Sequence, residues 1–159
     1  MKKNLLSRRS FTKLGLALPA LLAVPSAVFA KTISRFSLSK SGHALDGYDT
    51  TAYFSAGAAT DGTDATIVNW KGAKWRFANE EDAALFQANP EAYAPQFGGY
   101  CTRAMSLKKE VPGDPEVWRI HNGKLYVFFA SRGGKFFDKG PDDMIALAQV
   151  YWDTLTLTE

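Results

Sequence analysis

Residues Asn89 to Cys101 read Asn-Pro-Glu-Ala-Tyr-Ala-Pro-Gln-Phe-Gly-Gly-Tyr-Cys and contain the only cysteine of the chain. Proline fixes the backbone angle φ and does not continue a helix, whereas Gly98 and Gly99 allow backbone angles that other residues avoid. The segment is therefore predicted to be a rigid, shaped loop that holds Cys101 in one defined place. A helical pattern precedes this loop, and strand patterns follow it.

The residues before the loop predict a helix. Asn79 is a suitable N-cap, and residues 80–82 are acids in the first turn, where the helix dipole favours negative charge. The helix must end by Asn89, because Pro90 restricts the conformation of the residue before it.

A β-hairpin is predicted on either side of the loop. Residues 66–70 and 73–77 flank Lys71-Gly72, while residues 117–121 and 124–129 flank Asn122-Gly123. Asn-Gly is the strongest short hairpin signal, because both central residues of a type I′ turn need positive φ. In the second hairpin His121 is expected opposite Lys124 on the exposed face. The buried face is predicted to consist of Ile120, Leu125, Trp118, Val127 and Phe129.

The remaining patterns complete an α+β fold. Residues 50–54 are β-branched and aromatic and predict a strand, whereas the Gly- and Lys-containing residues 131–140 predict a loop. Pro141 suits the first position of a helix, and apolar residues follow it at helical spacing up to Leu155. The predicted architecture is a small, mostly antiparallel sheet built from two hairpins and the strand near Tyr53, with two packing helices.

Residues 1–30 have the composition of an export signal. The segment around Arg8-Arg9 resembles the twin-arginine signal, and an apolar run over residues 14–29 ends at the small residue Ala30. The run is shorter than the roughly 20 residues of a membrane span and contains two prolines. We therefore expect export to the periplasm by the twin-arginine pathway, with no stable membrane span after removal of the signal.

The rest of the chain is predicted to be a lead-in segment over residues 31–44 and one domain over residues 45–159. Residues 1–30 hold five of the 19 Lys and Arg residues and none of the 16 acids, which leaves 14 bases against 16 acids, a net charge of about −2. No basic stripe with interleaved aromatic residues is present, so nucleic acid is not an expected partner.

Several motifs recur together in one known family. They are Gly47-Tyr48-Asp49, Ala52-Tyr53-Phe54, Trp75-Arg76-Phe77, Asn89-Pro90, Gly98-Gly99-Tyr100-Cys101, Asp114-Pro115 and Gly123-Lys124-Leu125-Tyr126. This pattern resembles the YHS domain family, and more narrowly its exported stand-alone bacterial members, over residues 45–127. The resemblance implies a small metal-associated module of the kind fused to copper-transporting ATPases and to subunits of multicomponent monooxygenases.

Four residues are candidate metal ligands: Cys101, Met105, His43 and His121. Thiolate and thioether ligands select Cu(I), and imidazole suits copper or zinc, so copper is the preferred metal. The paired Cys and His spacings of a structural zinc site are missing. The alternative is a buried, inert cysteine with a packed methionine and two ordinary histidines.

A second set of residues could bind a ligand without a metal. It comprises Tyr48, Asp49, Tyr53, Tyr93, Gly98, Gly99 and Tyr100, together with Phe97. The five aromatic members could line a pocket beside Cys101, or they could be the core of an aromatic-rich domain.

No arrangement of a known hydrolase, zinc protease or phosphate-binding loop is present, so catalysis is not favoured. The preferred function is a periplasmic YHS-type module that binds or passes on a metal ion. The alternative is a metal-free module that binds a small ligand or a periplasmic protein partner.

Overall fold

The computed structural model describes residues 30–159. The export signal predicted for residues 1–30 therefore lies outside the described residues, apart from Ala30. The elements, in chain order, are β1 (Thr32–Ser34), η1 (Leu45–Gly47), α1 (Ala52–Ser55), β2 (Thr63–Trp70), β3 (Ala73–Phe77), α2 (Glu80–Ala88), α3 (Pro90–Tyr93), η2 (Gln96–Gly99), α4 (Thr102–Met105), β4 (Asp114–His121), β5 (Lys124–Phe128), α5 (Ser131–Phe137), α6 (Pro141–Trp152) and β6 (Thr156–Thr158). This mixture of helices and antiparallel hairpins confirms the predicted α+β class.

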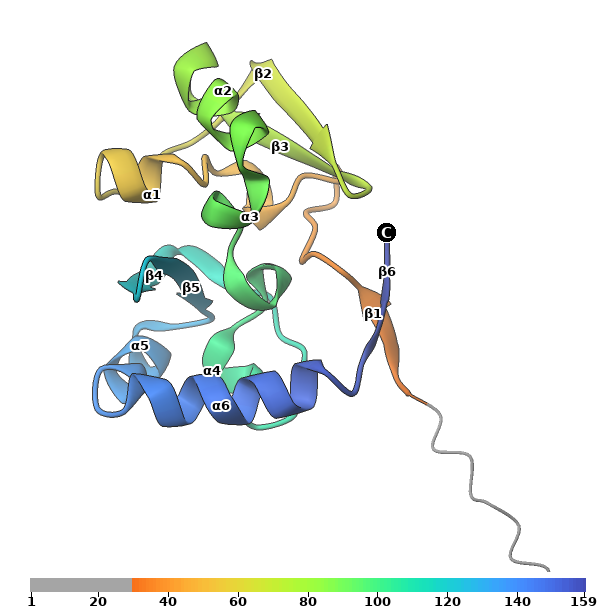
Figure 1. Ribbon diagram of the computed structural model, residues 1–159, viewed down its shortest axis with the longest axis vertical. Helices are drawn as coiled ribbons and strands as arrows, with labels where there is room; N and C mark the ends of the chain where they lie inside the picture. Colours follow the sequence, from red (N-terminus) through yellow and green to blue (C-terminus); the bar gives the residue numbers. More distant parts are fainter. Residues whose placement is uncertain (1–29) are drawn as a thin grey trace, which may run out of the picture.

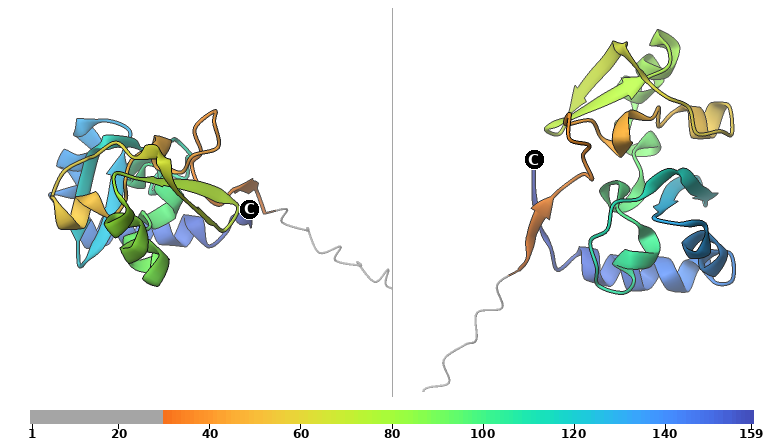
Figure 2. Two further views of the ribbon diagram at one scale, coloured as in Figure 1. Left: turned by 90° about the horizontal axis from the view of Figure 1, so that it is seen from above. Right: turned by 180° about the vertical axis from the view of Figure 1, so that it is seen from behind.

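The elements gather at two ends of the molecule (Figure 1). The β2–β3 hairpin and α2 lie at one end, α4, α5 and α6 lie at the other, and the β4–β5 hairpin lies between them. Within residues 30–159 the two hairpins form separate two-stranded sheets, not the one sheet that the sequence predicts. A third pair joins β1 to β6 in parallel, and these two strands lie side by side at one edge of the molecule (Figure 2).

Local turn chemistry predicts both hairpins correctly. Asn122 and Gly123 have φ of 49° and 70°, as a type I′ turn requires. Ile120 pairs with Leu125 and His121 with Lys124, in the predicted register. The two helices with clear start signals are also confirmed: the side chain of Asn79 accepts a hydrogen bond from the backbone N–H of Asp82, and α6 begins at Pro141.

The predicted buried face of the second hairpin is partly wrong. Leu125 and Val127 are buried, but Phe129 is 64% exposed and Ile120 is also exposed. Tyr126 and Phe128, on the other face of β5, are buried as well. The reason is that α4 and α5 pack against β5, so the strand has no solvent face.

Two element predictions are wrong because tertiary contacts override local preference. Residues 50–54 were expected to be a strand, but they contribute to α1, whose first N–H groups are bound by the buried side chain of Asp49. Residues 131–140 contain α5 instead of a loop. A β-carbon at Gly133 would lie 3.2 Å from the β-carbon of Phe128, so this glycine lets α5 approach the hairpin.

The buried side chains form three clusters, and residues 89–101 join two of them. This segment is not the continuous loop that the sequence predicts, because it contains α3 and η2. Ala94 packs with Trp75 and Phe86 at the β2–β3 end, whereas Phe97 and Cys101 pack with the helices at the other end. None of the helices in residues 30–159 has the length and apolar character that a membrane span requires.

Candidate functional site: an apolar cavity beside Cys101

The glycine pair fixes the path of the loop that leads to Cys101. Gly98 has φ of 61°, and a β-carbon there would lie 1.9 Å from the carbonyl oxygen of Arg35. The carbonyl oxygen of Gly98 accepts a hydrogen bond from the N–H of Ser37 (2.8 Å), and that of Gly99 accepts one from Gly113 (3.0 Å). Only glycine allows the loop to approach residues 35–37 this closely.

Cys101 is held by hydrogen bonds of both its backbone and its side chain. Its N–H donates to the carbonyl oxygen of Val111 (2.8 Å), and its Sγ accepts from the N–H of Ala104 (3.4 Å) as the N-cap of α4. The residue is only 4% exposed, yet it forms part of the wall of a cavity. Cys101 therefore lies at the boundary between the buried core and this cavity.

This space, the Cys101 cavity, has a volume of about 400 Å³. It is lined by Cys101, Arg103, Ala104, Leu107, Lys109, Val111, Phe129, Ala130, Arg132, Gly133 and Phe136. Two of its apolar residues, Phe129 (64% exposed) and Leu107 (51% exposed), lie open to solvent. Such a volume with mostly apolar walls falls within the range of small-molecule sites, about 300–1,000 Å³.

Cations surround the Cys101 cavity. The Cζ of Arg103 lies 4.9 Å from the ring centroid of Phe136, that of Arg132 lies 5.5 Å from it, and the Nζ of Lys139 lies 5.6 Å from it. A smaller cavity of about 200 Å³ adjoins the first through Arg132 and Phe136 and is otherwise lined by Lys135 and Lys139. Among the residues that the structure describes, none of these four cations forms an ion pair with an acid.

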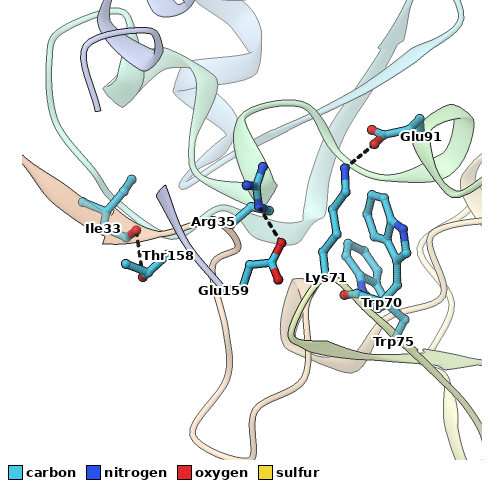
Figure 3. Close-up of polar contacts among 8 residues, drawn as sticks. All are labelled: Ile33, Arg35, Trp70, Lys71, Trp75, Glu91, Thr158 and Glu159. Carbon is cyan, nitrogen blue, oxygen red and sulfur yellow. Dashed lines mark hydrogen bonds and ion pairs between the residues drawn. The ribbon is translucent and has the colours of Figure 1, made fainter. Parts of the chain in front are cut away.

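Another cavity, of about 170 Å³ near Phe97, has a different electrostatic character. Its two cations have acidic partners: Arg35 lies 3.9 Å from a carboxylate oxygen of Glu159, and Lys71 is paired with Glu91 (Figure 3). The Nζ of Lys71 also lies 4.5 Å from the ring centroid of Trp70. Each of these cations therefore has an acidic neighbour within the fold.

The predicted aromatic ligand site is not gathered around Cys101. Tyr53 is buried, and its hydroxyl donates to the carbonyl oxygen of Pro115 (3.0 Å). Asp49 is also buried and accepts N–H groups from three residues, while burial raises the pKa of its carboxyl. The half-buried Tyr48 donates to Glu116, which with burial raises the pKa of its phenol. Tyr48, Asp49 and Tyr53 therefore hold η1, α1 and β4 together.

The other predicted ligand-binding residues also make contacts within the fold. Tyr93 packs edge-on against Phe54, with 5.5 Å between ring centroids. The hydroxyl of Tyr100 donates to the carbonyl oxygen of Ser34 (3.1 Å), and Gly98 and Gly99 bind the backbone as described above. Of the predicted set, Gly98 and Phe97 line the small cavity near Phe97, and none lines the Cys101 cavity.

The four predicted metal ligands fall into three places. Cys101 and Met105 share one buried cluster at opposite ends of a single helical turn. His43 forms an isolated backbone β-bridge with Lys74 of β3. The Nε2 of His121 lies 2.8 Å from a carboxylate oxygen of Asp142. His43 therefore lies beside the β2–β3 hairpin, whereas His121 lies at the end of β4, next to α6. No group of three or more His, Cys, Asp or Glu side chains in residues 30–159 is placed to hold a metal ion.

The residues that line the Cys101 cavity were not selected from the sequence, apart from Cys101 itself. One signal was available: Arg132, Lys135, Phe136 and Lys139 follow the i, i+3, i+4, i+7 spacing of one helix face. The two glycines beside them favoured a loop instead.

The fold and the cavity together define a small α+β domain with a ligand-sized apolar site. No family model matches the chain, and no curated protein or solved structure matches it significantly either. The likeness to the YHS family therefore rests on the residue pattern alone.

Proposed function

We propose that the chain is an exported YHS-type binding module that holds a small organic ligand in the Cys101 cavity and does not catalyse a reaction. The observation that carries this proposal is the cavity itself, about 400 Å³ in volume, with the chain's only cysteine among the residues that line it. The twin-arginine-like segment around Arg8-Arg9 supports a periplasmic location.

The geometry favours a ligand over a protein partner. The cavity is concave and small, and Ala104, Val111 and Phe136 give it apolar walls. Burial of apolar ligand surface contributes about 25 cal/mol per Å², so even a ligand with two fused rings gains several kcal/mol before the cost of association.

Binding of phenylnaphthylamine, a neutral dye that fluoresces in apolar surroundings, tests the proposal on the full chain. Ala130 is exposed at the edge of the cavity, so Ala130→Trp should fill the cavity without disturbing the core. We expect the parent to bind the dye and Ala130→Trp to weaken binding about fivefold or more, which corresponds to about 1 kcal/mol.

The matched control is Ala146→Trp, which introduces the same ring at an exposed position of α6 that does not line the Cys101 cavity. This control should bind the dye as the parent does. If the parent fails to bind, or if both tryptophan variants bind equally, the cavity is not a ligand site.

Copper is the second candidate, because Cys101 and Met105 are four residues apart in one turn and pack in the same cluster. Thiolate and thioether suit Cu(I), and His43 and His121 would play no part. Titration against a Cu(I) chelator tests this candidate. Both Cys101→Ser and Met105→Leu should then lower the affinity for Cu(I), whereas His43→Ala should not. Parent-like affinity in Cys101→Ser would exclude this site.

A further inference from the structure

From the charges around the cavity we infer that its ligand is an amphiphilic anion, with an apolar body in the Cys101 cavity and an acid group beside Arg132. This inference rests on the proposed ligand-binding function and names the chemical class of the ligand. The acid can be a carboxylate, a sulfonate or a phosphate ester.

Positive charge is concentrated around the two adjoining cavities. Residues 31–159 contain more acids than bases, 16 against 14. Six of these 14 Lys and Arg residues nevertheless lie in or next to α4 and α5. The six are Arg103, Lys108, Lys109, Arg132, Lys135 and Lys139. A local excess of one sign raises the local concentration of ligands of the opposite sign.

These cations are also close together and lack acids. Arg103, Arg132 and Lys139 all lie within 6 Å of the ring centroid of Phe136. Cations gathered around one ring repel each other, and their attraction to the face of that ring compensates only part of the repulsion. In residues 30–159 the nearby acid Asp138 is already bound by Arg119. An external anion would relieve the repulsion.

The two cavities differ in their walls. The larger cavity has apolar walls, with Arg103, Lys109 and Arg132 as its cations, whereas the smaller cavity is lined by Arg132, Lys135, Lys139 and Phe136. Because Arg132 and Phe136 belong to both cavities, a ligand can bury its apolar part in one cavity and present its acid group to the other. The guanidinium of arginine binds carboxylate or phosphate with two parallel hydrogen bonds.

The paired cations near Phe97 provide an internal comparison. Arg35 and Lys71 line a cavity there, but each has an acidic neighbour, Glu159 and Glu91 respectively (Figure 3). The fold therefore supplies acidic partners at one cationic cavity and not at the other, which points to the Cys101 cavity as the place where an outside acid binds.

The test compares two dyes that share one body. Anilinonaphthalenesulfonate carries a sulfonate on the same rings as the neutral phenylnaphthylamine. If three partly exposed cations each contribute about 0.5 kcal/mol, the sulfonate should bind about tenfold more tightly than the neutral dye. The affinity advantage of the sulfonate should shrink as ionic strength rises, because salt screens the attraction between exposed charges. The screening length is about 10 Å at 0.1 M.

Two charge-reversal variants locate the effect. Lys109→Glu and Arg132→Glu should each lower the preference for the sulfonate over the neutral dye at least threefold, an estimate for reversing one exposed charge, whatever each change at the cavity wall does to the two dyes in common. Lys124→Glu changes the net charge equally but lies at the exposed start of β5, outside both cavities, and should alter the binding of neither dye. Circular dichroism checks that every variant is folded.

Other results would overturn either the anionic character of the ligand or the ligand site itself. Equal binding of the two dyes by the parent, or equal effects of Lys109→Glu and Lys124→Glu, refutes the anionic ligand but leaves a neutral ligand in the cavity. Failure of the parent to bind either dye refutes the ligand site as well. Sulfonate binding that survives Ala130→Trp would place the dye on the exposed surface and refute the inference.

Discussion

The carboxylate of Asp49 shows how one residue can set the path of a segment. Its Oδ1 accepts the N–H groups of Thr51 (2.8 Å) and Ala52 (3.2 Å), and its Oδ2 accepts that of Ala78 (2.9 Å). The side chain is completely buried. It therefore joins the start of α1 to the end of β3, two segments that are distant in the sequence.

We predict that Asp49→Asn lowers the free energy of unfolding by about 2 kcal/mol. An amide has the same shape but only one oxygen, so it can satisfy the donors on one side and presents its own N–H₂ to the other. Urea unfolding measures the change. Asp46→Asn, in the same turn but exposed, is the control and should unfold as the parent does. Equal stability of the two variants would mean that Asp49 does not hold these segments together.

At the residue scale the sequence identifies positions better than it identifies their roles. Gly98, Gly99 and Cys101 are predicted to form a shaped loop, because glycine and proline act through their own backbone angles. Asp49 and Tyr53 are also singled out, but as ligand-binding residues. Asp49 also has a distant partner, Ala78, 29 residues away, and the partner of Tyr53, Pro115, is 62 residues away. No local pattern shows these distant hydrogen bonds.

At the scale of elements, one ion pair helps to position α5. Arg119 of β4 binds Asp138 at the C-cap of α5 through two hydrogen bonds, Nε to Oδ1 (2.8 Å) and Nη2 to Oδ2 (2.9 Å). A β-carbon at Gly134 would lie 3.2 Å from Nη2 of Arg119, so the guanidinium rests directly against the helix. This contact helps to position Arg132 and Phe136, and with them one wall of the Cys101 cavity.

We predict that Asp138→Asn costs about 1 kcal/mol of stability at neutral pH, because a bidentate pair at the surface is worth about that much. The hydrogen bonds from Arg119 hold the pKa of Asp138 below its ordinary value of 3.8 in the folded protein. The parent's advantage is therefore fully present above that value, and it is lost as the pH falls through the lower pKa of the folded state. Urea titrations of both proteins from neutral to acidic pH measure the difference. A difference that grows on acidification would contradict this assignment.

The prediction of elements succeeds where the signal is local and fails where the contact is distant. Asn122-Gly123 and Pro141 predict a turn and a helix start correctly, because their own backbone preferences fix these structures. Gly133 and Gly134 indicate a loop by their own preferences, whereas in α5 they provide room for Phe128 and Arg119. Because α5 supplies one wall of the Cys101 cavity, a sequence pattern that does not predict α5 does not predict the cavity either.

At the scale of the whole molecule, β6 connects the two ends of the fold. It follows α6 at one end, pairs with β1, and reaches the turn of the β2–β3 hairpin at the other (Figures 1 and 2). Arg35 donates its N–H to the carbonyl oxygen of Thr158 (2.7 Å). Residues 32–34 and 156–158 are so far apart in the sequence that no local pattern predicts their pairing.

Two turn glycines allow this connection to be tested with a matched pair. Gly72 and Gly123 both sit in two-residue hairpin turns, with φ of 75° and 70°. A β-carbon at Gly72 would lie 2.9 Å from the carbonyl carbon of Glu159, whereas one at Gly123 would meet nothing within 4 Å. Alanine at either position therefore brings the same backbone strain, about 1 kcal/mol, but only at Gly72 does it also displace the end of β6.

We predict that Gly72→Ala lowers the free energy of unfolding by about 0.5–1 kcal/mol more than Gly123→Ala does, because the displaced residues lose part of the β1–β6 pairing. Amide hydrogen exchange gives a local readout. Exchange at the N–H of Arg35 should accelerate in Gly72→Ala and stay at the parent rate in Gly123→Ala, since this N–H depends on Thr158 for its protection. If both variants lose the same stability and protect Arg35 equally, the contact of β6 with the hairpin turn contributes nothing to joining the two ends of the molecule.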